Sequence, residues 1–487
     1  MRPPAIVLVA AVLLLGCPKR PEATSGSPAA SSTPLPVPGG RIATTAPAPP
    51  RTDTLRPSAS APPPVAPVPS FQPVPADPRA IGVAVPLSGK QKAWGEAVLQ
   101  GVALALGEDG AYTVVVKDTR GEPEGAQSAL AEMAAEGGPI AALGGVVTAE
   151  AARAAVAAQQ GALPFVSLSR AEDVTRAGPF VFRNMLTAQA QARALTEYAV
   201  SRRGMRRFAL LWPQIAYGQE LASAFWDDVE AHGGEVRAAE SYEADRTTFA
   251  PLVKSMVGKL WLDERQDYQQ QLREIAAQEP DPYRRRKAIQ RARDRLPPLV
   301  DFDAVFIPDF ARNVALVAPA LAVEDVITQT CDPREVERIR RTTGREDLQP
   351  VQLLGANGWD DPALIEKAGR YVECAVFVDG FYAGSERPDT KAFVTAFQAR
   401  YGHLPSILEA SAYDAALLIR RALEHGAATR DAVRAALAAT KDFHGATGDL
   451  SFDDRREVTK RLFFLTVERG AIRELTPEEA GAGPGGS

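Results

Sequence analysis

The chain has 487 residues, of which 45% are hydrophobic and 24% are charged, and its formal net charge is −5. A chain of this length and composition is expected to form two or three domains with buried cores. The acidic balance excludes a protein whose main partner is a nucleic acid, because phosphates are bound by strongly basic surfaces. The four His and three Cys residues do not fall at metal-ligand spacing, so we expect neither a metal site nor a cofactor.

The N-terminus carries an export signal. Met1–Arg2 is a short basic start, Ala5–Leu15 is an unbroken apolar run, and Leu14–Cys17 resembles the processing site of bacterial lipoproteins. We therefore predict a signal peptide at residues 1–17 and lipidation of Cys17, which would anchor the protein to a membrane. The alternative is an ordinary secretory signal with a coincidental Cys. Because residue 18 is Pro rather than Asp, the outer membrane of a Gram-negative-type envelope, facing the periplasm, is favoured over the inner membrane.

Residues 18–78 contain 18 Pro among 61 residues, and most of the others are Ala, Ser, Thr and Val. Such a segment cannot bury enough apolar surface to offset the entropy lost on ordering it. We predict a disordered tether, which would span less than about 200 Å as extended polyproline II. It is either a passive spacer or a device that lets the rest of the chain cross the cell-wall mesh.

Residues 79–487 are predicted to form an α/β head in which strands and helices alternate. Apolar, β-branched runs predict strands at 80–86, 112–117, 140–143 and 163–167 in the first half, and at 208–212, 235–242, 304–308, 351–354 and 374–381 in the second. This order implies parallel sheets covered on both faces, with ligands bound beyond the carboxyl ends of the strands. Two such halves in succession predict two lobes with a cleft between them.

A set of short motifs runs through the head in a fixed order: Ile81–Gly89, Trp94–Glu96, Gly101, Gly145, Ser167, Phe180–Arg183, Tyr217–Gly218, Glu409–Asp414 and Thr447–Phe452. The set, which covers nearly all of 80–475, resembles type I periplasmic solute-binding proteins of the leucine/isoleucine/valine type. The resemblance implies two doubly wound parallel-sheet lobes joined by a three-strand hinge. Lobe one would comprise about 80–187 and 383–446, and lobe two about 188–382 and 447–487.

The resemblance also implies a ligand site in the cleft. In the family, the loops after the third and fourth strands of lobe one bind a ligand carboxylate through backbone N–H groups and hydroxyls, next to a helix N-terminus. Aromatic residues from both lobes pack on the ligand. The alternatives are that Thr148 is a plain helix cap and that the aromatic side chains only fill the core. The expected ligand contacts are Trp94, Val147, Thr148, Ser167, Ser169, Arg170, Tyr217, Phe310 and Asn357.

Two features depart from the family pattern. The second loop is one residue shorter than usual and contains Arg170, which would either hold a carboxylate or phosphate bidentately or be solvated. Asn357 stands where the family has an acid that meets the ligand's ammonium group, and Asp360 or Asp309 would be substitutes that do not align. An uncompensated ammonium in a closed cleft costs several kcal/mol, which argues against a free α-amino acid as the ligand.

Two charged insertions have no counterpart in a minimal solute-binding protein. Residues 260–299 predict two helices around Pro280–Pro282, and the second helix carries the basic run Arg284–Lys287. This pair is either a solvated hairpin or a surface for a partner. The second insertion lies near 328–349. Cys331 and Cys374 are candidates for a disulfide, because disulfides persist outside the cytoplasm.

No Ser/His/Asp, Cys/His or paired-carboxylate arrangement stands out, so we name no catalytic residue and do not expect an enzyme. The leading hypothesis is a lipid-anchored solute-binding protein that captures a small polar or amino-acid-like ligand, such as an amino acid or another small carboxylate, and presents it to an ABC permease. The alternative is an outer-membrane lipoprotein of the same fold that docks on peptidoglycan synthases and activates them, as penicillin-binding protein activators do.

Overall fold

The computed structural model describes residues 75–107, 110–345 and 348–480. The predicted signal peptide, Cys17 and residues 18–74 of the predicted tether lie outside the described residues. The first strand begins at Asp77, inside the range predicted as tether. Within the described part, none of the helices combines the length and the apolar character needed to cross a bilayer.

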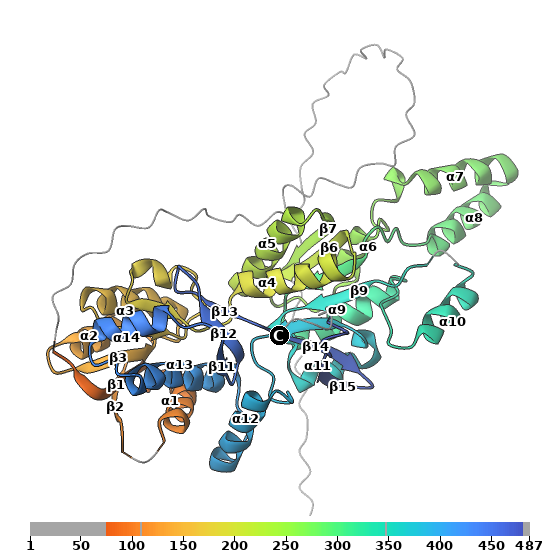
Figure 1. Ribbon diagram of the computed structural model, residues 1–487. Coiled ribbons are helices and arrows are strands. Elements are labelled where there is room, and N and C mark those ends of the chain that lie inside the picture. The colour runs from red at the N-terminus through yellow and green to blue at the C-terminus, as the bar shows by residue number, and fades with distance from the viewer. Residues whose placement is uncertain (1–74, 108–109, 346–347, 481–487) are drawn as a thin grey trace, which may run out of the picture. The chain divides into compact units, whose positions relative to one another are not determined.

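Lobe one is built on a five-stranded, wholly parallel sheet in the order β2-β1-β3-β4-β5 (Figure 1). Its strands are β1 (Asp77–Val85), β2 (Thr113–Asp118), β3 (Pro139–Gly144), β4 (Phe165–Ser167) and β5 (Val181–Arg183). Its helices are α1 (Lys92–Leu106), α2 (Pro123–Ala134), α3 (Thr148–Gln160), the 3-10 turn η2 (Val174–Ala177), α12 (Pro388–Tyr401), α13 (Ile407–Glu424) and α14 (Arg430–Ala438). The sheet therefore takes its strands from the first half of the head and three of its helices from much later in the chain.

Apolar side chains cover both faces of this sheet. One core cluster joins β1 and β3 to α1, α13 and α14, and a second, rich in Ala, joins the other face to α2 and α3. Because Ala packs with little side-chain volume, α2 and α3 can lie close to the strands. This arrangement brings the carboxyl ends of β3 and β4, and the loops that follow them, to one edge of the sheet.

Lobe two is built on a seven-stranded sheet in the order β15-β14-β10-β9-β8-β6-β7, in which β14 and β15 are antiparallel to their neighbours. Its strands are β6 (Arg207–Pro213), β7 (Glu235–Tyr242), β8 (Ala304–Ile307), β9 (Gln352–Gly355), β10 (Val376–Asp379), β14 (Phe463–Glu468) and β15 (Ala471–Glu474). Its helices are α4 (Ala188–Thr196), the π-helix η3 (Glu197–Arg202), α5 (Ala216–Ala231), α6 (Ala250–Met256), α9 (Ala311–Val323) and α11 (Pro362–Ala368), with short turns η5 (Asn357–Trp359) and η6 (Gly369–Val372).

A third, antiparallel sheet lies where the chain passes between the lobes. It consists of β11 (Phe443–Gly445), β12 (Gly448–Phe452) and β13 (Val458–Lys460). Leu450, Phe452 and Val458 from this sheet belong to the core cluster of lobe one, although their range was predicted for lobe two. The proposed domain limits stay a prediction.

Polar contacts hold this connecting sheet in place. Asp414 accepts hydrogen bonds from the backbone N–H groups of Ala446 (2.7 Å) and Thr447 (2.9 Å) and from the Thr447 hydroxyl (2.6 Å). Lys460 donates to the same hydroxyl at 2.7 Å. Burial lowers the pKa of Lys460 to about 8, while the charge of Asp414 acts in the opposite direction. One buried carboxylate of α13 therefore fixes the point at which the chain leaves lobe one.

The two predicted insertions are helical. The first contains η4 (Leu262–Glu264), α7 (Gln266–Gln278) and α8 (Pro282–Arg295), and the second contains α10 (Pro333–Thr343). Cys331, just before α10, forms a disulfide with Cys374, just before β10, and their Cα atoms are 5.3 Å apart. The second insertion is therefore covalently tied to the centre of the lobe-two sheet.

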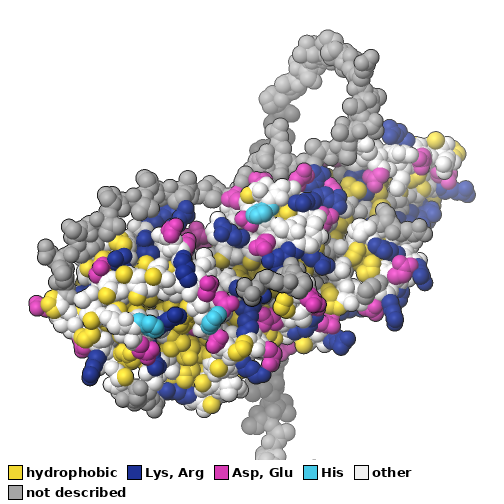
Figure 2. All heavy atoms as spheres, in the orientation of Figure 1, with side chains coloured by type: hydrophobic (Ala, Val, Ile, Leu, Met, Phe, Trp, Pro, Cys, Tyr) yellow, Lys and Arg dark blue, Asp and Glu magenta, His cyan; other side chains and the backbone are white. Residues whose placement is uncertain are grey.

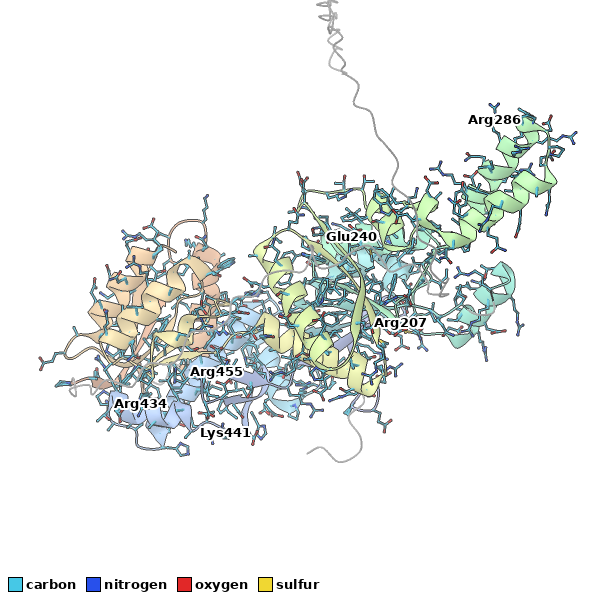
Figure 3. All side chains as sticks on the ribbon, turned by 90° about the horizontal axis from the view of Figure 1, so that it is seen from above. Arg207, Glu240, Arg286, Arg434, Lys441 and Arg455 are labelled. Carbon is cyan, nitrogen blue, oxygen red and sulfur yellow. A yellow bond between two sulfur atoms is a disulfide. The ribbon has the colours of Figure 1, made fainter. Side chains whose placement is uncertain are left out.

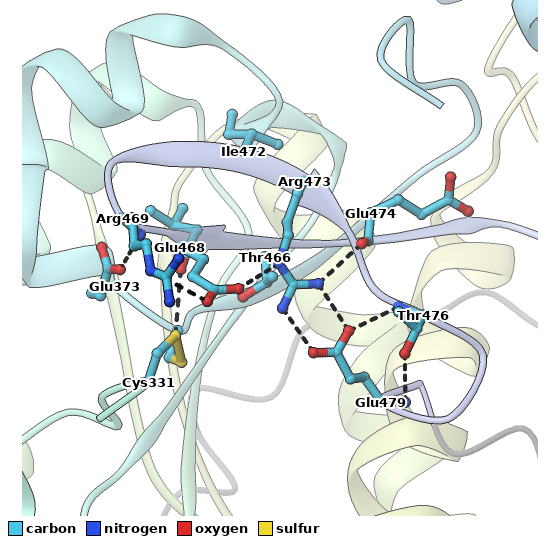
Figure 4. Close-up of polar contacts among 12 residues, drawn as sticks. Cys331, Glu373, Thr466, Glu468, Arg469, Ile472, Arg473, Glu474, Thr476 and Glu479 are labelled. Atoms are coloured by element: carbon cyan, nitrogen blue, oxygen red, sulfur yellow. Dashed lines mark hydrogen bonds and ion pairs between the residues drawn. A yellow bond between two sulfur atoms is a disulfide. The ribbon is translucent and has the colours of Figure 1, made fainter. Parts of the chain in front are cut away.

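The end of the described chain is held by ion pairs on β15 (Figure 4). Arg473 contacts Glu468 on β14 at 2.6 Å and Glu479 beyond β15 at 2.7 Å. The hydrogen bond from Arg473 lowers the pKa of Glu479 to about 2. These ion pairs therefore attach the last described turn of the chain to the antiparallel edge of the sheet.

Candidate functional site

In the loop after β3 in lobe one, a buried carboxylate of the chain binds a backbone amide. Glu150, in the first turn of α3, is fully buried, and its carboxylate accepts the backbone N–H of Val147 at 3.2 Å. Burial raises the pKa of Glu150. Val147 is itself buried, whereas Thr148 is exposed at the start of the helix. The chain's own carboxylate thus takes an amide that was expected to face an anionic ligand.

The loop after β4 has a similar character. Ser167 and Ser169 are both fully buried. The Ser167 hydroxyl oxygen accepts the N–H of Ser169 at 3.3 Å, and the Ser169 hydroxyl oxygen accepts the N–H of Ala171 at 3.1 Å. These hydrogen bonds fix the shape of the loop. Of the three residues of this loop that were expected to contact a ligand, Arg170 is the exposed one.

Arg183 on β5 fixes the position of this loop. Its guanidinium, which is 4% exposed, donates to the carbonyl oxygens of Arg170 and Ala171 and pairs with Glu457 at 2.6 Å. Glu457 also accepts from the Thr175 hydroxyl at 2.6 Å. The connecting sheet and the Arg170 loop are therefore coupled through one buried ion pair.

Lobe two contributes an aromatic pair. Tyr217, at the start of α5, stacks on Phe310, which precedes α9, with ring centroids 4.7 Å apart and planes 19° from parallel. The Tyr217 hydroxyl donates to the side-chain oxygen of Asn357 at 2.9 Å and accepts the N–H of Gly358 at 3.0 Å. Burial raises the pKa of Tyr217. Three of the predicted contacts from lobe two, Tyr217, Phe310 and Asn357, are thus brought together.

Arg170 joins the two groups of residues. Its guanidinium carbon lies 5.7 Å from the centre of the Tyr217 ring, within the range of a cation–π contact. The small cavity beside them has a volume of about 20 Å³ and is lined by Arg170, Leu186, Ala188, Gln191, Tyr217, Glu220 and Leu221. A space of this size holds about one water molecule. A ligand that entered here would have to separate Arg170 from Tyr217.

Trp94 lies apart from this group. It is in the first turn of α1 and is 50% exposed. No contact joins it to Arg170 or Tyr217 among the described residues, and the same holds for Val147 and Thr148. The predicted site residues therefore form one connected group around Tyr217 and a set of separate lobe-one positions.

The acids that were considered as substitutes differ in their surroundings. Asp309 is fully buried and already accepts from the hydroxyl of Tyr242 (2.5 Å) and the amide of Asn313 (2.9 Å), so it is committed to the lobe-two core. Burial, followed by the charge of Asp361, raises the pKa of Asp360 to about 6. Asp360 has no ion pair among the described residues.

Three residues that the sequence reasoning missed belong to this region. The side-chain oxygen of Gln191 on α4 accepts the N–H of Asn357 at 2.9 Å, and the Glu150 carboxylate accepts the N–H of Val147. Asp379, at the end of β10, is 6% exposed, and burial raises its pKa well above the usual range. Only Asp379 had a signal in the sequence, because it ends an apolar strand at the ligand-binding edge of a parallel sheet. Within the described residues, no cluster of three or more His, Cys, Asp or Glu could hold a metal ion.

Comparison with protein families gives a match to the periplasmic binding protein family over residues 78–259 and 266–471. The break between the two matched segments falls at the start of the first predicted insertion. No curated protein matches the chain significantly.

Solved structures share the fold at low sequence identity. A protein assigned to branched-chain amino acid transport of the ABC type in Rhodospirillum rubrum is 21% identical, with a TM-score of 0.63 over 81% of this chain and 99% of that one. A branched-chain amino acid transporter substrate-binding protein of Streptococcus pneumoniae in complex with isoleucine is 21% identical (TM-score 0.52, 81% and 99%). A solute-binding protein of an ABC transporter from Rhodopseudomonas palustris in complex with 3,4-dihydroxybenzoic acid is 20% identical (TM-score 0.53, 81% and 96%).

Proposed function

The chain belongs to the periplasmic binding protein family, and from that premise we propose that it is a lipid-anchored solute-binding protein that delivers a small carboxylate to an ABC permease. The family is one of extracytoplasmic binding proteins rather than enzymes. The ligand would be held between the lobes and released when they separate, so its affinity depends on contacts from both lobes. The anchor would be the lipid on Cys17, with residues 18–78 as the tether and the outer membrane as its location.

The observation that carries this proposal is the contact of Arg170 with the Tyr217–Phe310 stack. A guanidinium above stacked aromatic rings offers a bidentate partner for a carboxylate and a flat apolar surface for the rest of the ligand. Isoleucine and 3,4-dihydroxybenzoic acid, which occupy two proteins of this fold, have a carboxyl group in common. In this chain Arg170 would bind the ligand's carboxylate in place of the Val147 amide, which Glu150 already occupies.

The second part of the proposal concerns the ligand's amino group. The side-chain oxygen of Asn357 is engaged by Tyr217, and its backbone N–H is engaged by Gln191. Asn357 therefore offers no charge to an ammonium group. We expect the ligand to be a carboxylate, aromatic or aliphatic, for which an α-amino group is not required.

Calorimetry with a panel of amino acids and of aromatic and aliphatic carboxylates tests this proposal. Arg170→Gln should weaken binding of the best carboxylate about 10- to 100-fold, because a hydrogen bond to a charged group contributes about 1.5–3 kcal/mol. Arg176→Gln is the matched control, since Arg176 lies on the same segment but pairs with Asp173 at 2.7 Å. Equal losses in both variants, or no binding by the parent chain, would contradict the proposal.

A second candidate function is the docking and activation of peptidoglycan synthases. Two features favour it: Glu150 occupies the Val147 amide that was expected to hold the ligand carboxylate, and Asn357 replaces the acid that the family resemblance implies for the ligand's ammonium group. If no small carboxylate binds, whereas a purified synthase binds the head and is stimulated by it, this alternative replaces the transport proposal.

A further inference from the structure

The first insertion is a helical hairpin with almost no apolar core of its own. Tyr268 is the one buried residue of α7, and α8 has none. The half-buried positions of α8, among them Arg285, Ile289 and Ala292, are the ones that can face α7. The hairpin therefore extends from lobe two as an arm, which we define as residues 266–295 (Figure 1).

The root of the arm is firmly held. Arg265, which is 4% exposed, donates to Asp267 at 2.6 Å and to the carbonyl oxygen of Pro297 at 2.9 Å, so one guanidinium joins the incoming and outgoing chains. The N–H of Leu299 donates to the Val257 carbonyl oxygen at 2.9 Å. At the tip, Asp281 caps α8 by accepting the N–H of Arg284 at 2.8 Å. These contacts are consistent with a preformed arm rather than a loose loop.

The arm carries a concentrated positive charge. Helix α8 has seven basic residues and one acidic residue, although the whole chain has a net charge of −5. Within the described residues, no carboxylate lies within ion-pair distance of any α8 cation. Figure 2 shows Lys and Arg side chains along the arm, and Figure 3 shows side chains of the hairpin, Arg286 among them, projecting outward.

Four of these cations share one face of the helix. Arg284, Lys287, Arg291 and Arg295 are separated by three, four and four residues, which is the spacing of neighbours along a helix face. All four are exposed. Tyr283, which is 64% exposed, lies at one end of this stripe with the Lys287 ammonium 4.7 Å from its ring centre. We call these four residues the α8 stripe.

Helix α10, in the second insertion, shows the contrast. It also has three exposed arginines on one face, Arg334, Arg338 and Arg341. Here Arg338 pairs with Glu335 at 2.5 Å and Arg341 with Glu337 at 2.9 Å. Two of these three arginines therefore have a carboxylate partner within α10, whereas no cation of the α8 stripe has one among the described residues.

We infer that the α8 stripe docks the head on the surface of a bilayer that contains anionic phospholipid. A protein partner would be expected to bury an apolar centre, whereas the one large exposed apolar side chain of α8, that of Tyr283, lies at the end of the stripe and not at its centre. The segment that precedes the described residues is not a complementary partner either, because residues 1–74 contain six basic and two acidic residues. A flat array of phosphate groups needs only a charged stripe, and each Lys or Arg near such a surface contributes about 1 kcal/mol.

Partition of the processed chain, residues 17–487 with Cys17→Ser, onto vesicles tests this inference independently of the ligand and of the anchor. We expect binding to vesicles with about one third phosphatidylglycerol, and little to phosphatidylcholine alone. Raising the salt from about 0.1 M to about 1 M should abolish binding, because screening shortens from about 10 Å to 3 Å. The combined variant Arg284→Gln, Lys287→Gln and Arg291→Gln should lower the partition coefficient on the order of 100-fold.

The matched control is Arg334→Gln, Arg338→Gln and Arg341→Gln on α10, which removes the same number of charges. It should change partition less than about threefold, because those arginines are largely paired. Gln preserves helix propensity, so circular dichroism should be unchanged in both variants. The inference is overturned if the parent chain does not bind anionic vesicles, if both triple variants lose binding equally, or if the α8 variant keeps vesicle binding and loses a purified protein partner instead.

Discussion

The two lobes present different surfaces to the proposed ligand site. In lobe one the polar side chains of the expected loops, Glu150, Ser167 and Ser169, are buried and bonded to their own backbone. In lobe two the Tyr217–Phe310 pair lies near Asp379, which is buried, and the half-buried Asp360 follows η5; neither acid has an ion pair among the described residues. In the proposed site, lobe one would therefore provide a fixed frame that carries Arg170, and lobe two would provide the surface on which ligand preference is set.

The frame of lobe one can be broken at Arg183. Arg183→Ala would leave the largely buried Glu457 carboxylate without its ion-pair partner. This loss is expected to lower the free energy of unfolding by about 3–5 kcal/mol. Urea denaturation measures this loss. Arg341→Ala is the control, because Arg341, whose side chain is 79% exposed, pairs with Glu337 on the surface at 2.9 Å and should cost at most about 0.5 kcal/mol. Similar losses in both variants would mean that the Arg183 contacts do not support the frame.

The contribution of the two lobes to binding can be compared with one aromatic truncation in each. Burial of a large side chain contributes about 1.5–3 kcal/mol, so Tyr217→Ala should weaken binding of the best carboxylate about 10- to 100-fold. Trp94→Ala should weaken it less, because Trp94 is half exposed and lies apart from the Tyr217 group. Calorimetry decides between them, and a larger loss for Trp94→Ala would place the main ligand surface in lobe one.

The acids of lobe two give an effect that is visible only in the pH dependence of stability. The pKa of Asp360 is raised to about 6 in the folded state from 3.8, so the folded state holds this proton more tightly than the unfolded state does. Its stabilising contribution is present below about pH 4 and is lost as the pH rises through 6. Asp360→Asn should remove this loss.

The unfolding free energies of Asp360→Asn and the parent chain should therefore diverge between about pH 4 and pH 6 and keep a constant difference above that range, with the variant the more stable. Asp245→Asn, at an exposed position, is the control and should follow the parent chain at every pH. Parallel curves for Asp360→Asn and the parent would show that Asp360 is solvated in the folded protein.

The alternation of apolar strands and amphipathic helices predicted most of the fold. Glu235–Tyr242 is a strand at the bounds that the sequence indicated, and the helices of the first insertion were also recognised. Strand β5 was missed as a strand, because three residues are too few to show a period. Nothing in local sequence indicated that residues 448–460 would pack on the core of lobe one, since that depends on contacts with distant segments.

The candidate site was less predictable than the fold. Residue type and loop position pointed to Arg170, Tyr217 and Asn357, and the structure brings them together. The engagement of Asn357 by Tyr217 depends on side-chain direction, which spacing does not reveal. In the sequence Glu150 is an ordinary residue of the first turn of a helix. The structure shows that its buried carboxylate accepts the Val147 N–H, a contact that the sequence does not indicate.

The interleaving of the chain has a consequence for export. The main core cluster of lobe one joins residues 81–185 to residues 412–458. Because synthesis proceeds from the N-terminus, this core cannot close until nearly the whole head has been made. The lobe that is encoded first is thus completed only near the end of synthesis, and a nascent chain that cannot finish its first lobe would stay extended enough to be threaded through a translocation channel.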